Sequence, residues 1–294
     1  MKYTGVFIIY NPKSTGSSQE LAKDLMQKLL AKFPKLKIKL QPTKYAGHAQ
    51  EIAYKCALST RHPLIISSSG DGGYNEVING AMKAQMKGAK PVCAVLAAGN
   101  ANDHSRTLQN KSLYQAIASG QETKIDLLKI KFSSNQKTTT RFAHSYIGLG
   151  LTPVVAIELN KTSLNALKEL LILVKTFYKF RPFRIQVASK NIKLDSIIFT
   201  NIGEMAKVLT VAKNAKPDDG LFEIVIFPHD NKFKLIRKLA KATATGLQPP
   251  KRSNEYDFKV LKKTPVQFDG EVSYIDKNSI VKIEAQKQIL RTIL

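Results

Sequence analysis

The sequence of 294 residues contains no tryptophan and only two cysteines, Cys56 and Cys93. Two cysteines cannot build a disulfide-stapled fold, and no pair of histidines stands near them to complete a structural zinc site. We therefore expect two buried free thiols in a reducing compartment. No apolar run approaches the ~20 residues that a membrane-spanning helix needs, and the short run Val6–Tyr10 lacks the features of a signal peptide. The sequence predicts a cytoplasmic protein that meets a membrane only at its surface.

Acidic residues are scarce as well. Only 22 Asp and Glu oppose 46 Lys and Arg, so the formal net charge is +24. Such a surplus suits a nucleic-acid backbone, an anionic membrane or a phosphorylated substrate, although it can also serve solubility alone. Eight of the basic residues are Arg, the side chain on which base-edge recognition depends. The excess of lysine therefore favours general attraction to phosphate groups over sequence-specific DNA binding.

The first part of the chain alternates strand-like and helix-like segments. Apolar runs predict strands over residues 6–10, 36–40, 63–66 and 92–96, and helical spacing of apolar residues predicts helices over 19–33, 46–59 and 75–86. This rhythm predicts an α/β domain over residues 1–124, with an open parallel sheet and helices on both of its faces. At 43% hydrophobic residues, the chain can bury the cores of roughly two domains.

From residue 125 the pattern changes to short strands separated by turns, which is typical of an antiparallel β domain. We place this second domain over residues 125–284, and residues 285–294 are expected to pack back onto the first domain. The stretch Gln136–Arg141 is predicted to be a loop. Helices are predicted over 164–178 and 232–245. The apolar stripe of the first of these indicates a core-facing surface, with contact to a membrane or acyl chain as the alternative.

Several standard nucleotide and hydrolase motifs are missing, namely GxxxxGK[ST], GxGxxG, GxSxG and HExxH. The chain has instead Ser69-Gly-Asp-Gly-Gly-Tyr-Asn-Glu-Val-Ile-Asn-Gly80, between a predicted strand and a predicted helix. Three glycines in such a turn expose backbone amides to phosphate oxygens, and the following helix directs its positive end to the same place. Asp71 would repel a phosphate, so its presence indicates a magnesium ion; a plain strand–helix turn is the alternative.

Two further segments have the same polar, glycine-containing character. Residues Ala97 to Arg106 follow the next predicted strand, at the edge where the carboxyl ends of a doubly wound sheet form a ligand crevice. Far away in sequence, Phe268-Asp-Gly-Glu271 stands between two short strands. Taken alone, Asp269-Gly270 is typical of a type I′ hairpin turn.

Taken together, these segments resemble the diacylglycerol kinase catalytic-domain family, which includes bacterial lipid kinases and the sphingosine and ceramide kinases. The family's loop GGDGTxNEVxNG corresponds to SGDGGYNEVING here, GTxNDFAR to GNANDHSR, and its late acidic motif to Asp269–Glu271. Further matches are Asn11–Gly16, Ile125-Asp126 and Pro217–Leu221, in the family's order. The chain departs from the pattern at three positions, where Ser69 replaces glycine and Gly73 and Asn100 each replace threonine. Gly73 thereby lacks a hydroxyl that could bind phosphate.

The resemblance implies a kinase that transfers the γ-phosphoryl group of ATP to a lipid hydroxyl, with diacylglycerol as the first candidate and Mg²⁺ as cofactor. It implies Glu271 as the general base and Asp269 as its helper at the nucleotide or metal. The residues implied to bind the nucleotide are Asn11, Lys13, Gly70, Gly72, Gly73, Asn75, Glu76, Gly99 and Asn102. Those implied to hold magnesium are Asp71, Asp103 and Asp126, with a second, structural ion at Lys216, Asp219 and Leu221.

Other functions remain open from the sequence. NAD kinases share the GGDG loop and the two-domain plan but lack the other motifs, and a basic nucleic-acid-binding protein would rest on charge alone. We expect no nucleic-acid partner. Ten basic and two acidic residues lie between Asn231 and Lys263, which indicates attraction to an anionic membrane surface. The resemblance also implies that the protein can form a homodimer.

Overall fold

The computed structural model describes residues 2–14, 16–109, 111–154, 176, 180–205, 209–230 and 251–294. The chain divides into two compact units. Unit 1 comprises Met1–Asp126 with Lys287–Leu294, and unit 2 comprises Leu127–Gln286. The predicted helix over 232–245 lies outside the described residues, and so does nearly all of the one predicted over 164–178.

Unit 1 is built on a parallel sheet. Its strands are β2 (Ile38–Pro42), β1 (Gly5–Tyr10), β3 (Pro63–Ser69) and β4 (Val92–Ala97), in that spatial order. The end of β17 (Ile280–Thr292) runs parallel to β4, with Thr292 opposite Cys93. Strands β1 and β3 are buried along almost their whole length, as strands covered on both faces must be. The predicted open parallel sheet is confirmed.

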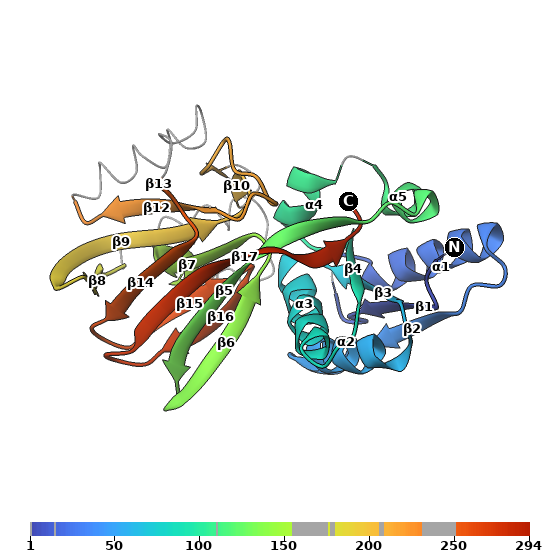
Figure 1. The fold of residues 1–294 in the computed structure, drawn as a ribbon, viewed down its shortest axis with the longest axis horizontal. Helices are drawn as coiled ribbons and strands as arrows, with labels where there is room; N and C mark the ends of the chain where they lie inside the picture. The colour runs from blue at the N-terminus through green and yellow to red at the C-terminus, as the bar shows by residue number, and fades with distance from the viewer. Residues whose placement is uncertain are drawn as a thin grey trace. The chain divides into compact units, whose positions relative to one another are not determined.

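Helices cover both faces of this sheet. Figure 1 shows α1 (Ser18–Lys32) and α5 (Leu113–Ser119) on one side of the strands, and α2 (His48–Ser59) and α3 (Asp71–Gln85) on the other. Apolar residues of α1 and α5, such as Leu25, Leu29 and Ile117, pack against Ile8 and Ile66 of the sheet. A short helix, α4 (Asp103–Leu108), follows β4.

Unit 2 is mostly antiparallel. Its strands are β5 (Thr123–Ser134), which begins in unit 1, β6 (Lys137–Ala143), β7 (Tyr146–Gly150), β8 (Phe183–Val187), β9 (Lys190–Thr200), β10 (Glu204–Met205), β11 (Leu209–Thr210), β12 (Phe222–Pro228), β13 (Lys251–Ser253), β14 (Glu255–Val260), β15 (Thr264–Phe268), β16 (Glu271–Ile275) and the first part of β17. Inward side chains of these strands form a core that includes Phe199, which contacts the rings of Phe222, Tyr256 and Phe258. A second cluster of buried side chains includes Ile198 and Phe227. The predicted antiparallel β region is confirmed.

One predicted loop is wrong. Residues Gln136–Arg141 were expected to be irregular, but Lys137–Ala143 form β6, which pairs with β5 from Ser134↔Lys137 onward. The turn consists of Asn135 and Gln136, both with positive φ of 49° and 60°, as a two-residue hairpin of the primed type requires. The threonines of β6 have a high preference for strands, and this preference outweighs the polar composition.

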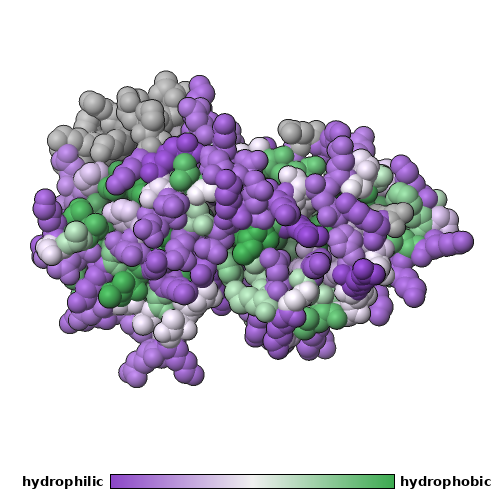
Figure 2. Space-filling view, in the orientation of Figure 1, coloured by the Kyte–Doolittle hydropathy of each residue, from purple (hydrophilic) through white to green (hydrophobic). Residues whose placement is uncertain are grey.

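The surface agrees with the composition. Hydrophilic residues cover much of the face drawn in Figure 2. Among the described residues, no helix is long and apolar enough to cross a membrane. Both cysteines are free and buried, as predicted, and burial raises the pKa of Cys56 to about 11 and that of Cys93 to about 12.

Candidate active site

The glycine motif forms the junction between β3 and α3 in unit 1. The sequence predicted a glycine turn followed by a helix from Asn75, but α3 begins at Asp71, with Gly70 as its N-cap. Gly72 and Gly73 therefore lie in the first turn of the helix, and not in a turn before it. Among the described residues, no side chain forms a capping hydrogen bond at this helix end, and the first amides of a helix have no partner within the helix, so this end is suited to bind an anion.

The loop after β4 lies directly against this junction. A Cβ atom at Gly99 would lie 2.3 Å from the Cα atom of Gly70, so glycine is needed there for the two backbones to meet. Asn102 fixes the second loop, since its Oδ1 accepts from the Gly99 amide at 2.9 Å and its Nδ2 donates to the Gly99 carbonyl at 2.8 Å. The structure thus brings Gly70, Gly99 and Asn102 together.

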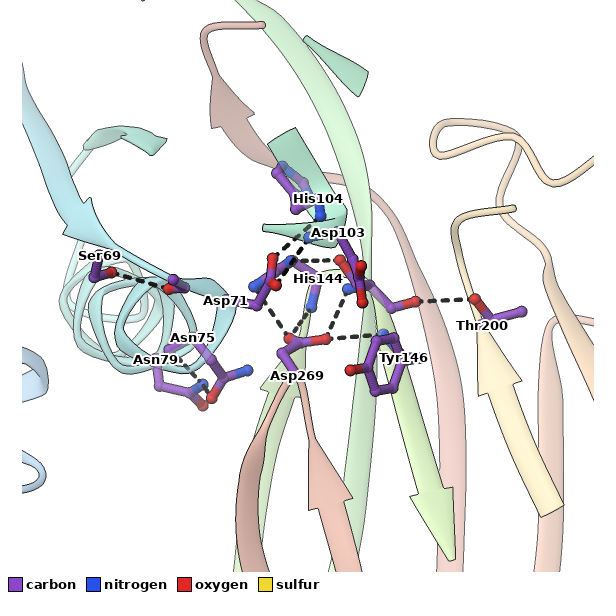
Figure 3. Close-up of polar contacts among 12 residues, drawn as sticks. Ser69, Asp71, Asn75, Asn79, Asp103, His104, His144, Tyr146, Thr200 and Asp269 are labelled. Atoms are coloured by element: carbon purple, nitrogen blue, oxygen red, sulfur yellow. Dashed lines mark hydrogen bonds and ion pairs between the residues drawn. The ribbon is translucent and has the colours of Figure 1, made fainter. Parts of the chain in front are cut away.

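Asp71 joins the two loops through its carboxylate. Its Oδ2 accepts a hydrogen bond from the backbone amide of Asp103 at 2.9 Å, and its Oδ1 accepts one from the amide of His104 at 3.1 Å. Figure 3 shows Asp71 pointing at these two residues. Both amides belong to the first turn of α4, where a negative charge is stabilised by the helix dipole. A carboxylate oxygen is the ligand type that Mg²⁺ prefers, directly or through water, so the chemistry of Asp71 fits this ion.

The other two predicted magnesium ligands of unit 1 have their own contacts. Asp103 is fully buried, with Nη1 of Arg106 4.0 Å from its Oδ1. Asp126 is also fully buried, and its Oδ1 accepts a hydrogen bond from the amide of Gln288 at 2.6 Å. Among the described residues, no three acidic, histidine or cysteine side chains are grouped to hold a metal ion.

Asn75 and Glu76 contact the protein itself. The Glu76 carboxylate accepts from the amide of Gly47 at 2.8 Å and from that of Ala49 at 3.1 Å, which caps the start of α2. Asn75 is buried, and Nδ2 of Asn79 donates to its side-chain oxygen at 3.0 Å. Glu76 therefore links α3 to the start of α2, whereas the two asparagines contact each other within α3.

The loop after β1 completes the edge of the sheet. Asn11 and Lys13 are exposed there, and Oδ1 of Asn11 accepts from the Lys13 amide at 2.9 Å. A Cβ atom at Gly16 would lie 2.1 Å from the carbonyl oxygen of Ala98, so this loop passes very close to the end of β4. Ser68 ties it to β3, since its hydroxyl donates to the carbonyl of Ser18 at 2.7 Å. This serine contact was not predicted from the sequence, although three serines in a row at a strand end were a visible signal.

The late acidic motif lies in unit 2, at the hairpin between β15 and β16. Phe268 pairs with Glu271, and the two residues between them, Asp269 and Gly270, have φ values of 49° and 100°. The motif is therefore a two-residue hairpin of the primed type. Glu271, the predicted general base, is exposed at the start of β16.

Asp269 is fully buried and binds three successive backbone amides. Its carboxylate accepts from His144 at 2.7 Å, from Ser145 at 3.0 Å and from Tyr146 at 2.8 Å, and Nε2 of His144 lies 3.3 Å from its Oδ2. Figure 3 shows these contacts between the hairpin and the start of β7. Asp269 thus fixes the turn that presents Glu271. Neither His144 nor Ser145 was predicted from the sequence to take part in the site.

The predicted second metal site lies in the turn before β12. Oδ1 of Asp219 accepts from the Leu221 amide at 3.0 Å, and the guanidinium of Arg252 forms an ion pair with its Oδ2. Nε of Arg252 also donates to Oε1 of Glu223 at 3.2 Å. Lys216 is exposed at the start of the turn. A cation from the protein thus already contacts the one side chain that was expected to bind this ion.

Comparison with known structures defines the class of this fold. A solved structure described as a putative diacylglycerol kinase from Bacillus anthracis strain Sterne matches with a TM-score of 0.74, covering 100% of this chain and 98% of that one. A second diacylglycerol kinase structure from the same strain matches with a TM-score of 0.72. Their sequence identities are 20% and 19%, so this likeness establishes the fold: an α/β unit joined to an antiparallel β unit, as in these kinases.

Sequence comparison finds similarity to the same kind of kinase. Residues 5–130 match the family model of the diacylglycerol kinase catalytic domain. A diacylglycerol kinase of Bacillus subtilis strain 168 is 28% identical, over 90% of this chain and 88% of its own. Another, from Staphylococcus carnosus strain TM300, is 22% identical over 98% of this chain and 97% of its own. The resemblance seen in the sequence is thereby confirmed, with residues 5–130 matching the family model of the diacylglycerol kinase catalytic domain.

Proposed function

We propose that this protein is an ATP-dependent lipid kinase with diacylglycerol as its acceptor. The match to the family model supports a kinase, and the β3–α3 junction carries the proposal further, because the first amides of α3 can bind phosphate oxygens. Asp71 lies at the same junction, where it would hold Mg²⁺ through water. The ion would neutralise charge on the transferring phosphoryl group.

In this reaction the lipid hydroxyl oxygen attacks the γ-phosphorus, and the bond to the oxygen that bridges the β- and γ-phosphates breaks. ADP leaves with that oxygen, and the hydroxyl proton passes to the Glu271 carboxylate. Glu271 is exposed and stands on a turn that Asp269 anchors through three amides, so it is both accessible and held in place. The basic surface would bring the protein to an anionic membrane, where the acceptor lies.

The test is an assay with ³²P-labelled ATP and Mg²⁺, in which the acceptor is either NAD or mixed micelles that contain one of diacylglycerol, ceramide, a sphingoid base or phosphatidylglycerol. We expect labelled phosphatidic acid, and a loss of about 100-fold or more in kcat for Glu271→Gln and for Asp71→Asn. Asp24→Asn, at an exposed ion pair of α1, is the control that should retain full activity. Labelling of NAD with no labelled lipid, or full activity in either site variant, would overturn the proposal.

A further inference from the structure

Two of the departures from the family motif, Ser69 and Gly73, stand next to each other in space. Ser69 is the last residue of β3 and Gly73 lies in the first turn of α3. A Cβ atom built on Gly73 would lie 2.6 Å from Oγ of Ser69 and 2.7 Å from its Cβ. Real Cβ atoms essentially never come this close to another atom, so the side chain of Ser69 occupies the space that a side chain at position 73 would need.

Among the described residues, only Ser69 would clash with a side chain at position 73. The next atom near a Cβ at position 73 is Oγ of Ser67, at 4.0 Å, which is an ordinary van der Waals contact. With glycine at position 69, both close contacts would therefore disappear. The family motif has glycine at the position of Ser69 and threonine at that of Gly73, which is the reverse of the arrangement here. The two departures are thus one exchange, and not two separate losses.

The exchange also keeps a hydroxyl group at the junction between β3 and α3. Oγ of Ser69 lies 2.6 Å from the Cβ position of residue 73, and a threonine hydroxyl would lie one bond from that same Cβ. Oγ of Ser69 donates to the Gly70 carbonyl at 2.9 Å and shares a hydrogen bond of 2.7 Å with Oγ of Ser67. The residue is half-buried, and Figure 3 shows it beside the start of α3.

We propose that Ser69 is a positioning residue of the nucleotide loop, coupled to Gly73: it fills the space beside the first turn of α3 and supplies there the hydroxyl that the motif otherwise carries at position 73. The packing half of this proposal rests on geometry alone, whereas the role of the hydroxyl at the phosphates rests on the proposed kinase function.

The packing half is tested by a mutant cycle measured as thermal midpoints without nucleotide. Gly73→Thr alone should lower the midpoint by about 2–8 °C, because it forces an atom into occupied space. Adding Ser69→Gly should restore the midpoint to within about 1 °C of the parent protein, a coupling typical of residues in contact. The matched control is Ser67→Gly combined with Gly73→Thr, which should not be rescued, because Ser67 lies 4.0 Å from the Cβ position of residue 73 and does not crowd it.

If Gly73→Thr does not fold, Gly73→Ala serves the same test, since the close contacts already arise at Cβ. The proposal would be overturned if the changes in thermal midpoint caused by Ser69→Gly and Gly73→Thr simply added up in the double variant. It would also be overturned if Ser67→Gly restored the midpoint of Gly73→Thr.

The hydroxyl half is tested by the KM for ATP. When ATP binds, the Ser69 hydroxyl would turn its one proton from the Gly70 carbonyl to a phosphate oxygen. Ser69→Ala should therefore raise this KM by about tenfold with a smaller change in kcat, the effect of one lost hydrogen bond to a charged group. In the Ser69→Gly background, Gly73→Thr should restore the KM, whereas Gly73→Val, which has the same shape without a hydroxyl, should restore only the thermal midpoint. Equal KM values for the Thr and Val versions would overturn this half. If no variant and no parent protein binds ATP, the kinase proposal fails, while the thermal cycle still decides the packing.

Discussion

At the scale of single residues, Glu223 is the most unusual acid among the described residues. It is 3% exposed, and its Oε2 has no hydrogen-bond partner in the described part of the chain. Burial raises the pKa of its carboxyl group from the ordinary 4.5 to about 7, with Asp219 adding to the rise and Arg252 opposing it. A buried charge that is only partly paired is costly, and a proton relieves this cost.

The pH dependence of stability follows from the sign of this shift. Because the folded pKa lies above the unfolded one, the folded state holds the proton more tightly between pH 4.5 and about 7. We expect Glu223 to lower the free energy of unfolding as the pH rises through this window, by at most about 1.4 kcal/mol per pH unit. Urea unfolding of the parent protein and of Glu223→Gln, measured across this window, checks the prediction.

Glu223→Gln keeps an oxygen for the Arg252 contact but cannot titrate, so its stability should change less with pH. Glu255→Gln, at an exposed position, serves as the control and should retain the parent slope. Identical slopes in Glu223→Gln and the parent would show that the Glu223 pKa is not raised.

The sequence was enough to predict which residues belong to the candidate site, but it did not predict the contacts among them. The glycines of two loops and Asp71 could be placed at one sheet edge, since parallel strands end on the same side. Asp269 could be marked as important, but its burial against the amides of 144–146 depends on a partner more than 120 positions away, and no local pattern encodes that.

At the scale of elements, α2 illustrates a helix that depends on its neighbour. Its N-cap, Gly47, has no side chain to accept from the first amides, and α2 has no side-chain cap of its own. Glu76 of α3 supplies both oxygens instead. The two helices also approach very closely, since a Cβ atom at Gly80 would lie 2.2 Å from the carbonyl oxygen of Gln50.

Removal of this cap should destabilise unit 1. We expect Glu76→Ala to lower the free energy of unfolding by about 1 kcal/mol, or up to about 2, because two amides lose their acceptor. Circular dichroism during thermal unfolding measures the change. Glu20→Ala, in the exposed first turn of α1, is the control and should change stability little. A Glu76→Ala protein of parent stability with weakened ATP binding would instead favour the nucleotide contact that the motif implies.

Element types were predictable where hydrophobic periodicity was strong, as in β1, α1 and β3. The start of α3 at Asp71 was not predictable in this way, because glycines such as Gly72 and Gly73 are unfavourable inside a helix. The start of α3 is set by the close contact between Gly70 and Gly99 of the loop after β4, which is a tertiary effect. The strand β6 was missed for the opposite reason, since its run of threonines is polar but favours extended backbone.

At the scale of the whole molecule, the net charge of +24 should govern membrane affinity. Each Lys or Arg near an anionic surface contributes about 1 kcal/mol, and salt screens this attraction because the Debye length falls from about 10 Å at 0.1 M to about 3 Å at 1 M. Part of the most basic stretch, residues 231–250, lies outside the described residues.

We therefore expect binding to phosphatidylcholine vesicles with one-fifth phosphatidylglycerol to weaken by about tenfold or more between 0.1 and 1 M NaCl. Vesicle co-sedimentation measures this, with pure phosphatidylcholine vesicles as the control that should bind weakly at every salt concentration. Equal binding to both vesicle types, unchanged by salt, would count against an electrostatic membrane contact.

Unit 1 is assembled from two stretches of chain that are separated by the whole of unit 2. The later stretch completes the sheet beside β4, and Ile293 is fully buried in the same core as Ile8 and Leu64. During synthesis on the ribosome, all of unit 2 is made before those residues are added. Until then the sheet of unit 1 has an open edge and its core is incomplete. Unit 1 is therefore the first unit whose synthesis begins and the last unit that can complete its fold.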